Sequence, residues 1–243
     1  MPFPILIGFI VIFTVAMKAT SEIARIKTAL RKQTRAILNT ISRADIEARS
    51  NAVVEQLMCL PAWKNSTSLS CYISMPTGEV DTKPLLYGVL NEHEQETHAE
   101  RKALYVPKIT GKNSPDMVML QVKSTSEMEE FPENRWGIPE SPADGPDATY
   151  DGVIDLVVVP GVLFDASCHR VGHGKGYYDC FLERINKSNI DKSLPPPITV
   201  GVCFDEQVSE EPVPLEPHDL PLDFVVTPTR VFASSSSSSS SSI

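Results

Sequence analysis

Several familiar signatures are missing from this chain of 243 residues. Its five cysteines contain no CxxC pair, which is typical of reduced thiols in an intracellular protein rather than of a disulfide framework. A net charge of −9 without a large basic stripe excludes a general nucleic-acid binder, because such proteins neutralise phosphates with many lysines and arginines. Any anionic ligand must therefore be bound by a local cluster of cations.

The two ends of the chain lack the features of a membrane span or of a folded segment. Residues 2–17 are almost wholly apolar, but a bilayer-spanning helix takes about 20 residues. No basic segment precedes them and no good cleavage site follows. We expect residues 1–20 to form a leader outside the fold: a weak targeting segment, an unusual anchor or an upstream start codon. No stable membrane insertion is expected. The serine run near the C-terminus predicts a disordered tail over residues 233–243.

The most informative segment is RVGHGKGYYD, residues 170–179. Its three alternating glycines permit positive φ, so consecutive backbone N–H groups can turn toward an anion. Arg170 and Lys175 add positive charge, and the helix predicted to follow would direct its free amides at the same anion. The segment predicts a site for a nucleotide triphosphate.

This loop does not follow the two best-known phosphate motifs. Lys175 is followed by Gly176 rather than by Ser or Thr, and Tyr177 is too bulky for the last glycine position of a dinucleotide fingerprint. A glycine-rich surface turn remains the alternative interpretation. His169 and His173 have metal-like spacing, but the glycine between them predicts a turn, so a zinc site is not expected.

Strand and helix patterns alternate through the body of the chain. Two helices are predicted over residues 21–60, with Ser42 able to cap the second from Ala44. Another helix is predicted over residues 82–90, a polar loop over 91–100 and irregular structure over 134–142. Strands are predicted at 69–75, 103–107, 117–122, 156–159, 199–204 and 223–227. This order predicts an α/β fold: a single three-layer domain, residues 21–232, with a mostly parallel Rossmann-like sheet and helices on both faces.

Four segments carry a family resemblance. They are KTALR (27–31), YISMPTGEVDT (72–82), RWGIPE (135–140) and PGVLFDASCHRVGHGKGYYDCFLER (160–184), with a weaker match at Pro217-His218-Asp219 followed by Leu222-Asp223. With them the chain resembles the 5-formyltetrahydrofolate cyclo-ligase family, also called 5,10-methenyltetrahydrofolate synthetase, from about residue 23 to 231. The resemblance implies ATP- and Mg²⁺-dependent cyclisation of 5-formyltetrahydrofolate to 5,10-methenyltetrahydrofolate, through a phosphorylated formyl (iminium phosphate) intermediate, with release of ADP and phosphate.

The resemblance also implies residue roles. Nucleotide contacts fall on Lys27, Arg31, Arg170, Val171, Gly172, His173, Gly174, Lys175, Gly176, Tyr177 and Tyr178, among which Lys175, Arg170 and His173 are the catalytic candidates. Asp179 and Asp219 match magnesium ligands, which suits the preference of that ion for oxygen. The folate pocket is matched by Ile73, Met75, Glu79, Trp136 and Tyr177.

Plainer alternatives exist for several of these residues. Asp179 stands in the first turn of a helix, where a carboxylate gains about 0.3–1 kcal/mol without any metal. Glu79 could be exposed after its turn, with Asp81 close enough to be confused with it, and Trp136 could be ordinary packing. Because Tyr177 and Tyr178 are adjacent on a helix, one is expected in the core.

Two departures from the family pattern are visible. His173 stands where many relatives have a larger basic or aromatic residue, so a phosphate contact there could be pH-sensitive. The segment around Glu79 is one residue longer, at Pro76 to Gly78. At the level of the whole protein, a non-catalytic folate or nucleotide binder and a kinase-like enzyme on another acceptor are the alternatives. We expect a monomer in the cytoplasm, or alternatively in the mitochondrion, whose partner is a small molecule.

Overall fold

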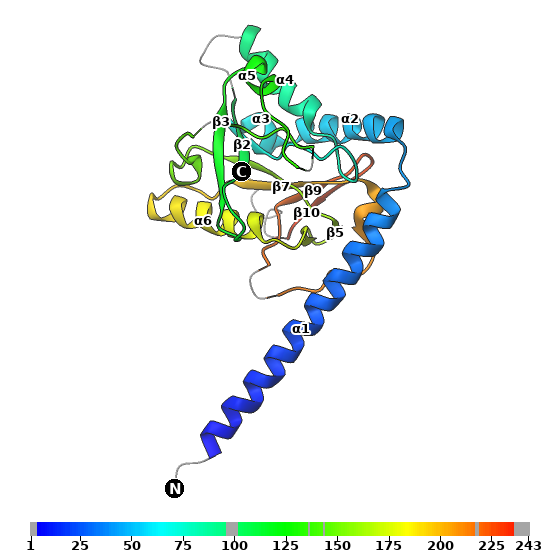
Figure 1. The fold of residues 1–243 in the computed structure, drawn as a ribbon, viewed down its shortest axis with the longest axis vertical. Helices are drawn as coiled ribbons and strands as arrows, with labels where there is room; N and C mark the ends of the chain where they lie inside the picture. The colour runs from blue at the N-terminus through cyan, green and yellow to red at the C-terminus, as the bar shows by residue number, and fades with distance from the viewer. Residues whose placement is uncertain (1–3, 96–101, 136, 143, 217–218, 236–243) are drawn as a thin grey trace.

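A computed structural model describes residues 4–95, 102–135, 137–142, 144–216 and 219–235 (Figure 1), with the backbone alone at 4–20 and 92–95. The helices are α1 (Pro4–Leu38), α2 (Arg43–Cys59), α3 (Pro61–Asn65), α4 (Lys83–Gln95), α5 (Thr125–Glu129) and α6 (Tyr177–Asp191), with short 3-10 turns η1 (Ala148–Tyr150) and η2 (Asp205–Gln207). The strands are β1 (Ser68–Cys71), β2 (Ala103–Ile109), β3 (Met117–Val122), β4 (Leu156–Val159), β5 (Leu163–Asp165), β6 (Arg170–Val171), β7 (Ile198–Val202), β8 (Val208–Ser209), β9 (Phe224–Val226) and β10 (Val231–Ala233).

The main sheet has seven strands in the order β10-β9-β7-β4-β1-β2-β3. The five strands from β9 to β2 run parallel to their neighbours, whereas β10 and β3 pair antiparallel at the two edges. The predicted mostly parallel α/β sheet is therefore confirmed.

Helices cover both faces of this sheet, as predicted. Alternate residues of β4 point to opposite faces, because side chains alternate along a strand. Leu156 and Val158 join a core with α2, α3, α4 and α5, while Val157 and Val159 join a second core with Phe181 of α6. In Figure 1 the first group of helices lies above the sheet and α6 lies below it.

A second, three-stranded sheet was not predicted. Strand β5 pairs antiparallel with β6 and parallel with β8. The glycine-rich loop therefore follows β6 of this small sheet and not β4 directly. The strands have only two or three residues each, which is too short for a periodic pattern to be recognised.

Two predicted element ends differ from the structure by four or five residues. Strand β1 ends at Cys71, not at Met75, because the next backbone N–H groups bond to side chains: Ser74 N donates to Thr82 Oγ1 at 3.1 Å and Met75 N to Glu79 Oε1. Helix α4 continues to Gln95, five residues into the predicted polar loop. The predicted cap is confirmed, since Ser42 Oγ accepts the Asp45 N–H at 3.1 Å.

Helix α1 runs without a break through the predicted leader boundary at residue 20. Its N-terminal half extends away from the rest of the molecule (Figure 1). Across the residues searched, which are the described ones, none of the helices combines the length and apolar character needed to cross a membrane. At the other end Ala233 lies in β10 and Ser234 is buried, and residues 236–243 lie outside the described part of the chain.

We expect deletion of residues 1–17 to leave a folded and active protein. Among residues 21–38, the part of α1 whose burial the structure describes, Lys27, Thr34 and Leu38 are buried, and the shortened helix keeps these contacts. Circular dichroism melting and activity of the shortened chain test this expectation. A shortened chain that aggregates or melts far below the full chain would show that the leader belongs to the folded core.

Candidate functional site

A cavity of about 730 Å³ lies at the carboxyl ends of the parallel strands. Tyr72 and Ile73 follow β1, Pro160 follows β4, and Pro107 and Ile109 come from β2. This is the edge of a parallel sheet where ligands usually bind. The size is in the range of pockets that enclose a small organic molecule.

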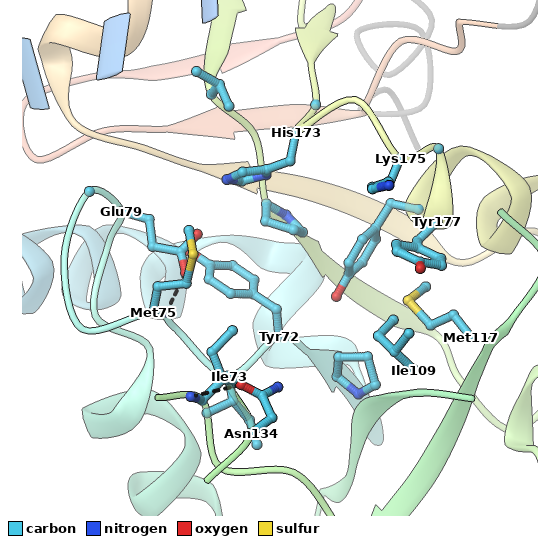
Figure 2. A pocket seen from close by; sticks show the side chains of 18 of the residues that line it. Tyr72, Ile73, Met75, Glu79, Ile109, Met117, Asn134, His173, Lys175 and Tyr177 are labelled. Carbon is cyan, nitrogen blue, oxygen red and sulfur yellow. Dashed lines mark hydrogen bonds between the residues drawn. The ribbon is translucent and has the colours of Figure 1, made fainter. Parts of the chain in front are cut away.

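Glu79 provides a buried carboxyl group in this cavity. The residue is 6% exposed, and its Oε1 accepts the backbone N–H of Met75. Burial raises its pKa to about 7; the hydrogen bond from the Met75 N–H opposes this rise, and the nearby charge of Asp81 adds a smaller contribution to it. Figure 2 shows Glu79 beside Met75 and Tyr72 on one side of the cavity. A carboxyl group that titrates near neutrality can accept or donate hydrogen bonds to a polar heterocycle.

The opposite side of the cavity is mainly apolar. Tyr177, Ile109 and Met117 lie together there in Figure 2, and the Tyr177 hydroxyl donates to the Gly111 carbonyl at 3.0 Å. Tyr178 also lines the cavity. Tyr178 packs against both hydrophobic cores, as expected for one of the two tyrosines, yet the first turn of α6 presents both side chains to the same cavity. The combination of flat apolar surface and one buried carboxyl suits a flat ring system with polar edges.

A second cavity of about 220 Å³ adjoins the first. Five residues line both cavities: Arg170, Gly172, Lys175, Gly176 and Asp179. The glycine-rich loop is therefore the shared wall. The small cavity is completed by Lys27 and Arg31 from α1 and by Glu216 and Asp219, so residues far apart in the sequence converge on it.

The glycines of the loop are required by its backbone. Gly174 has φ +97° and Gly176 has φ +70°, backbone angles that residues with a Cβ atom rarely adopt. A Cβ at Gly176 would also lie 3.0 Å from Ser114 Oγ. Arg31 packs against this loop, because its Nε donates to the Gly172 carbonyl at 2.7 Å. The geometry leaves the start of α6 facing the small cavity.

Four cations and three carboxylates face each other across the small cavity. Lys27 is 4% exposed and its Nζ donates to Glu216 Oε2 at 2.8 Å and to Asp219. Arg170 pairs with Asp179. Because each buried cation already has an anionic partner, the arrangement is stable without a ligand.

His173 lies at the rim of the large cavity with its side chain still in contact with solvent. Partial desolvation of the imidazole, followed by the positive charges of Arg35, Arg170 and Arg31, lowers its pKa to about 4. A neutral imidazole is therefore present at neutral pH. Any pH-sensitive phosphate contact at His173 is therefore expected near pH 4, well below the physiological range.

Every predicted site residue in the described ranges lines one of the two cavities. Trp136 lies outside the described residues. Asp81, the alternative to Glu79, lines neither cavity and instead accepts the Lys83 N–H at the start of α4. The roles predicted for these residues remain predictions, but the fold brings them to one place.

Some cavity residues were missed by the sequence analysis: Arg35, Ser114, Asn134 and Glu216. A signal existed for two of them. Arg35 stands four residues after Arg31, hence on the same helix face, and Glu216 directly precedes the matched segment at Pro217. Ser114 and Asn134 stand in loops, and no spacing rule connects them to the site.

The donor set fits a cation that arrives with phosphate. Among the described residues, no group of three or more His, Cys, Asp or Glu side chains forms a ready metal cage. Asp179 and Asp219 nevertheless line the same small cavity. Mg²⁺ is commonly held by one or two carboxylates together with substrate phosphates and water, so this arrangement suits Mg²⁺ better than a metal bound by protein alone.

Comparison with known proteins identifies the family. Over residues 23–228 the sequence matches the 5-formyltetrahydrofolate cyclo-ligase family. The chain belongs to this family. Relatives include the probable 5-formyltetrahydrofolate cyclo-ligase of Schizosaccharomyces pombe, 31% identical over 208 residues that cover 83% of this chain and 96% of the relative. The mitochondrial 5-formyltetrahydrofolate cyclo-ligase of Arabidopsis thaliana is 32% identical over 233 residues, covering 89% of this chain and 82% of the relative.

A solved structure supports the same assignment. The 5,10-methenyltetrahydrofolate synthetase of Aquifex aeolicus has a TM-score of 0.67 and 30% identity, covering 86% of this chain and 92% of that chain. The resemblance stated from the sequence is thus confirmed. As a cyclo-ligase family member the protein is an enzyme, a ligase of folate one-carbon metabolism that cyclises 5-formyltetrahydrofolate.

Proposed function

We propose that the protein uses ATP and Mg²⁺ to convert 5-formyltetrahydrofolate to 5,10-methenyltetrahydrofolate, releasing ADP and phosphate. The observation that carries this proposal is the adjacency of a cation-lined cavity to a larger, mainly apolar one, with Lys175 and Arg170 in the shared wall. A phosphate chain in the small cavity and a folate in the large one would meet at this wall.

The proposed reaction has two steps. The formyl oxygen of the folate attacks the γ-phosphorus of ATP, the bond to the bridging oxygen breaks, and ADP leaves. N10 of the folate then attacks the formyl carbon of the iminium phosphate, and the carbon–oxygen bond breaks as phosphate departs. The N10 proton is released, and the closed ring carries the methenyl carbon. A formyl oxygen is a poor leaving group, and phosphorylation makes it a good one.

In this mechanism the protein positions reactants and neutralises charge. Lys175 and Arg170 contact the phosphoryl group in transfer, and the backbone N–H groups at the start of α6 hold the phosphate chain. His173, which is neutral near pH 7, can donate or accept one hydrogen bond. Mg²⁺, held with phosphate oxygens by Asp179 and Asp219, would neutralise charge on the departing ADP. Catalysis of this kind depends on orientation more than on covalent chemistry.

The folate is proposed to lie in the large cavity. Its pteridine would place its polar edge at Glu79 and its faces against the apolar side chains of Ile73, Met75 and Tyr177. The pKa of Glu79 near 7 allows its carboxyl to exchange hydrogen bonds with a ring that offers both donors and acceptors.

A direct assay tests the proposed function. Purified protein is mixed with ATP, Mg²⁺ and 5-formyltetrahydrofolate, and the near-ultraviolet absorbance of the methenyl product is followed together with ADP release. We expect both signals at equal rates. ATP consumption without the methenyl band would indicate a kinase-like enzyme acting on another acceptor, and binding without either signal would indicate a non-catalytic binder.

We expect Lys175→Ala to raise the KM for ATP and to lower turnover by about tenfold. Its charge-assisted contact with phosphate is worth about 1.5–3 kcal/mol, and the low end applies because Lys175 is exposed. Lys187→Ala, on α6 outside both cavities, is the matched control with the same loss of charge. Unchanged kinetics of Lys175→Ala in steady-state assays would remove this residue from the site.

We further propose a monomer that acts in the cytoplasm or the mitochondrion. The Arabidopsis relative is named as mitochondrial. Light scattering of the purified protein and microscopy of the tagged full chain, with and without residues 1–17, test the two statements.

A further inference from the structure

Glu216 makes an unusual contact with the small cavity. Its Oε2 accepts from Lys27 Nζ at 2.8 Å, and the side chains are 15% and 6% exposed. Asp219, from the same segment before β9, holds the same ammonium and also accepts the Glu216 N–H at 2.7 Å. The most deeply buried amine of the cavity is therefore occupied by carboxylates before any phosphate arrives.

The charges that line this cavity nearly balance. Four cations and three carboxylates leave a net charge of +1 when all are ionised: Lys27, Arg31, Arg170, Lys175, Asp179, Glu216 and Asp219. A nucleotide triphosphate without a metal carries about four negative charges, so in this cavity it faces three carboxylates at short range. A divalent cation halves the charge of the nucleotide and can itself be attracted by the carboxylates.

Of the three carboxylates described at this cavity, Glu216 is the one without a proposed role in holding Mg²⁺. Asp179 pairs with Arg170, and Asp219 is one of the two residues proposed to hold Mg²⁺. The hydrogen bond of the Glu216 side chain is to Lys27, so its charge acts directly on the amine that a phosphate would need.

We propose that Glu216 is a specificity-determining residue: it competes with phosphate for Lys27 and so disfavours nucleotide that arrives without a divalent cation. The inference rests on the proposed function, because it assumes that the phosphate chain of ATP enters the small cavity. A divalent cation offsets the competition by screening the phosphates from Glu216, and the enzyme thereby selects the metal-bound nucleotide.

The test compares ATP binding with and without Mg²⁺. Isothermal titration calorimetry on the full chain gives the Kd for ATP in excess Mg²⁺ and in EDTA, for wild type and Glu216→Gln. In wild type we expect clearly tighter binding with Mg²⁺. In Glu216→Gln we expect the EDTA affinity to increase about tenfold, as for loss of one competing charge-assisted contact, while the Mg²⁺ affinity changes little, so the ratio falls about tenfold.

Two controls separate this role from a structural one. Glu206→Gln removes the same charge from a pair with Arg49 at 2.5 Å, outside both cavities, and should leave the ratio unchanged. Glu216→Asp keeps the charge and should retain most of the wild-type ratio. Because Lys27 keeps Asp219 as a partner, we expect Glu216→Gln to fold; thermal melting checks this, and Glu216→Ala serves as a second variant.

The outcomes are distinguishable. A ratio in Glu216→Gln equal to that of wild type, or affinities that weaken equally with and without Mg²⁺, overturns the inference, since Glu216 would then only hold Lys27 in place. Both of these results leave the proposed function intact, because ATP still binds. Wild-type protein that binds ATP under neither condition overturns the proposed function itself and this role with it.

Discussion

Arg170→Met is expected to lower kcat/KM for ATP by about a hundredfold or more. Arg170 is the most buried cation in the wall that the two cavities share, with 5% of its side chain exposed. A charge-assisted contact to phosphate in such a position is at the upper end of about 1.5–3 kcal/mol, and the second guanidinium donor adds to it. The effect should exceed that of Lys175→Ala, because Lys175 is exposed.

The fold should survive this substitution. Asp179, the partner that loses its cation, has 33% of its side chain exposed and can be hydrated, so the penalty of an unpaired buried charge is largely avoided. Arg184→Met is the matched control: Arg184 donates to the Met117 carbonyl and lies over the Tyr150 ring, outside both cavities. It should melt at a lower temperature yet keep its KM for ATP. Stopped-flow binding and steady-state kinetics measure both variants, and equal kinetic losses would argue against a phosphate contact for Arg170.

Glu79→Gln is expected to stabilise the protein at alkaline pH while weakening folate binding. The pKa of Glu79 rises from 4.5 in the usual case to about 7, mainly because of burial. The folded protein thus binds this proton more tightly than the unfolded chain. The cost of the buried carboxylate is absent below a pH of about 4.5, grows through the interval and is complete above about 7. Stability therefore falls as the pH rises through this window.

The expected gain for Glu79→Gln is at most about 3 kcal/mol near pH 8 and close to zero near pH 4.5, from the size of the pKa shift. Urea unfolding at the two pH values measures it. Glu183→Gln, an exposed substitution on α6, should show no such pH-dependent gain. Folate affinity of Glu79→Gln should fall by about tenfold to a hundredfold, because an amide cannot offer the hydrogen bonds of a carboxyl that gains and loses a proton. A variant with unchanged affinity would place the folate elsewhere.

Local patterns in the sequence were sufficient for the central elements. The apolar runs at β3 and β4 predicted their bounds correctly. The central parallel strand β4 is buried on both faces and therefore reads as a continuous hydrophobic segment. The Ser42 cap was predicted because side-chain capping depends on residues close in the chain. The strands of the small sheet could not be predicted, because pairing of β5 with β8 joins residues more than forty positions apart.

The end of β1 shows why a pattern can mislead. Tyr72 to Met75 continue the apolar alternation, and nothing nearby in the sequence says that the strand must stop. It stops because Thr82 and Glu79 side chains return to bond the backbone N–H groups of Ser74 and Met75. The same return places the Glu79 carboxyl in the cavity, so the mispredicted boundary and the candidate folate contact have one cause.

The sequence alone determined the backbone freedom and the local charge of the glycine-rich loop, because it places three glycines and two cations within ten residues. Tertiary structure decided what that loop faces. Lys27 and Asp219 are 192 positions apart, and only the packing of α1 against the segment before β9 brings them into one cavity. Folding then pairs the two buried cations of that cavity, Lys27 and Arg170, with carboxylates, a property that no residue has until the chain folds.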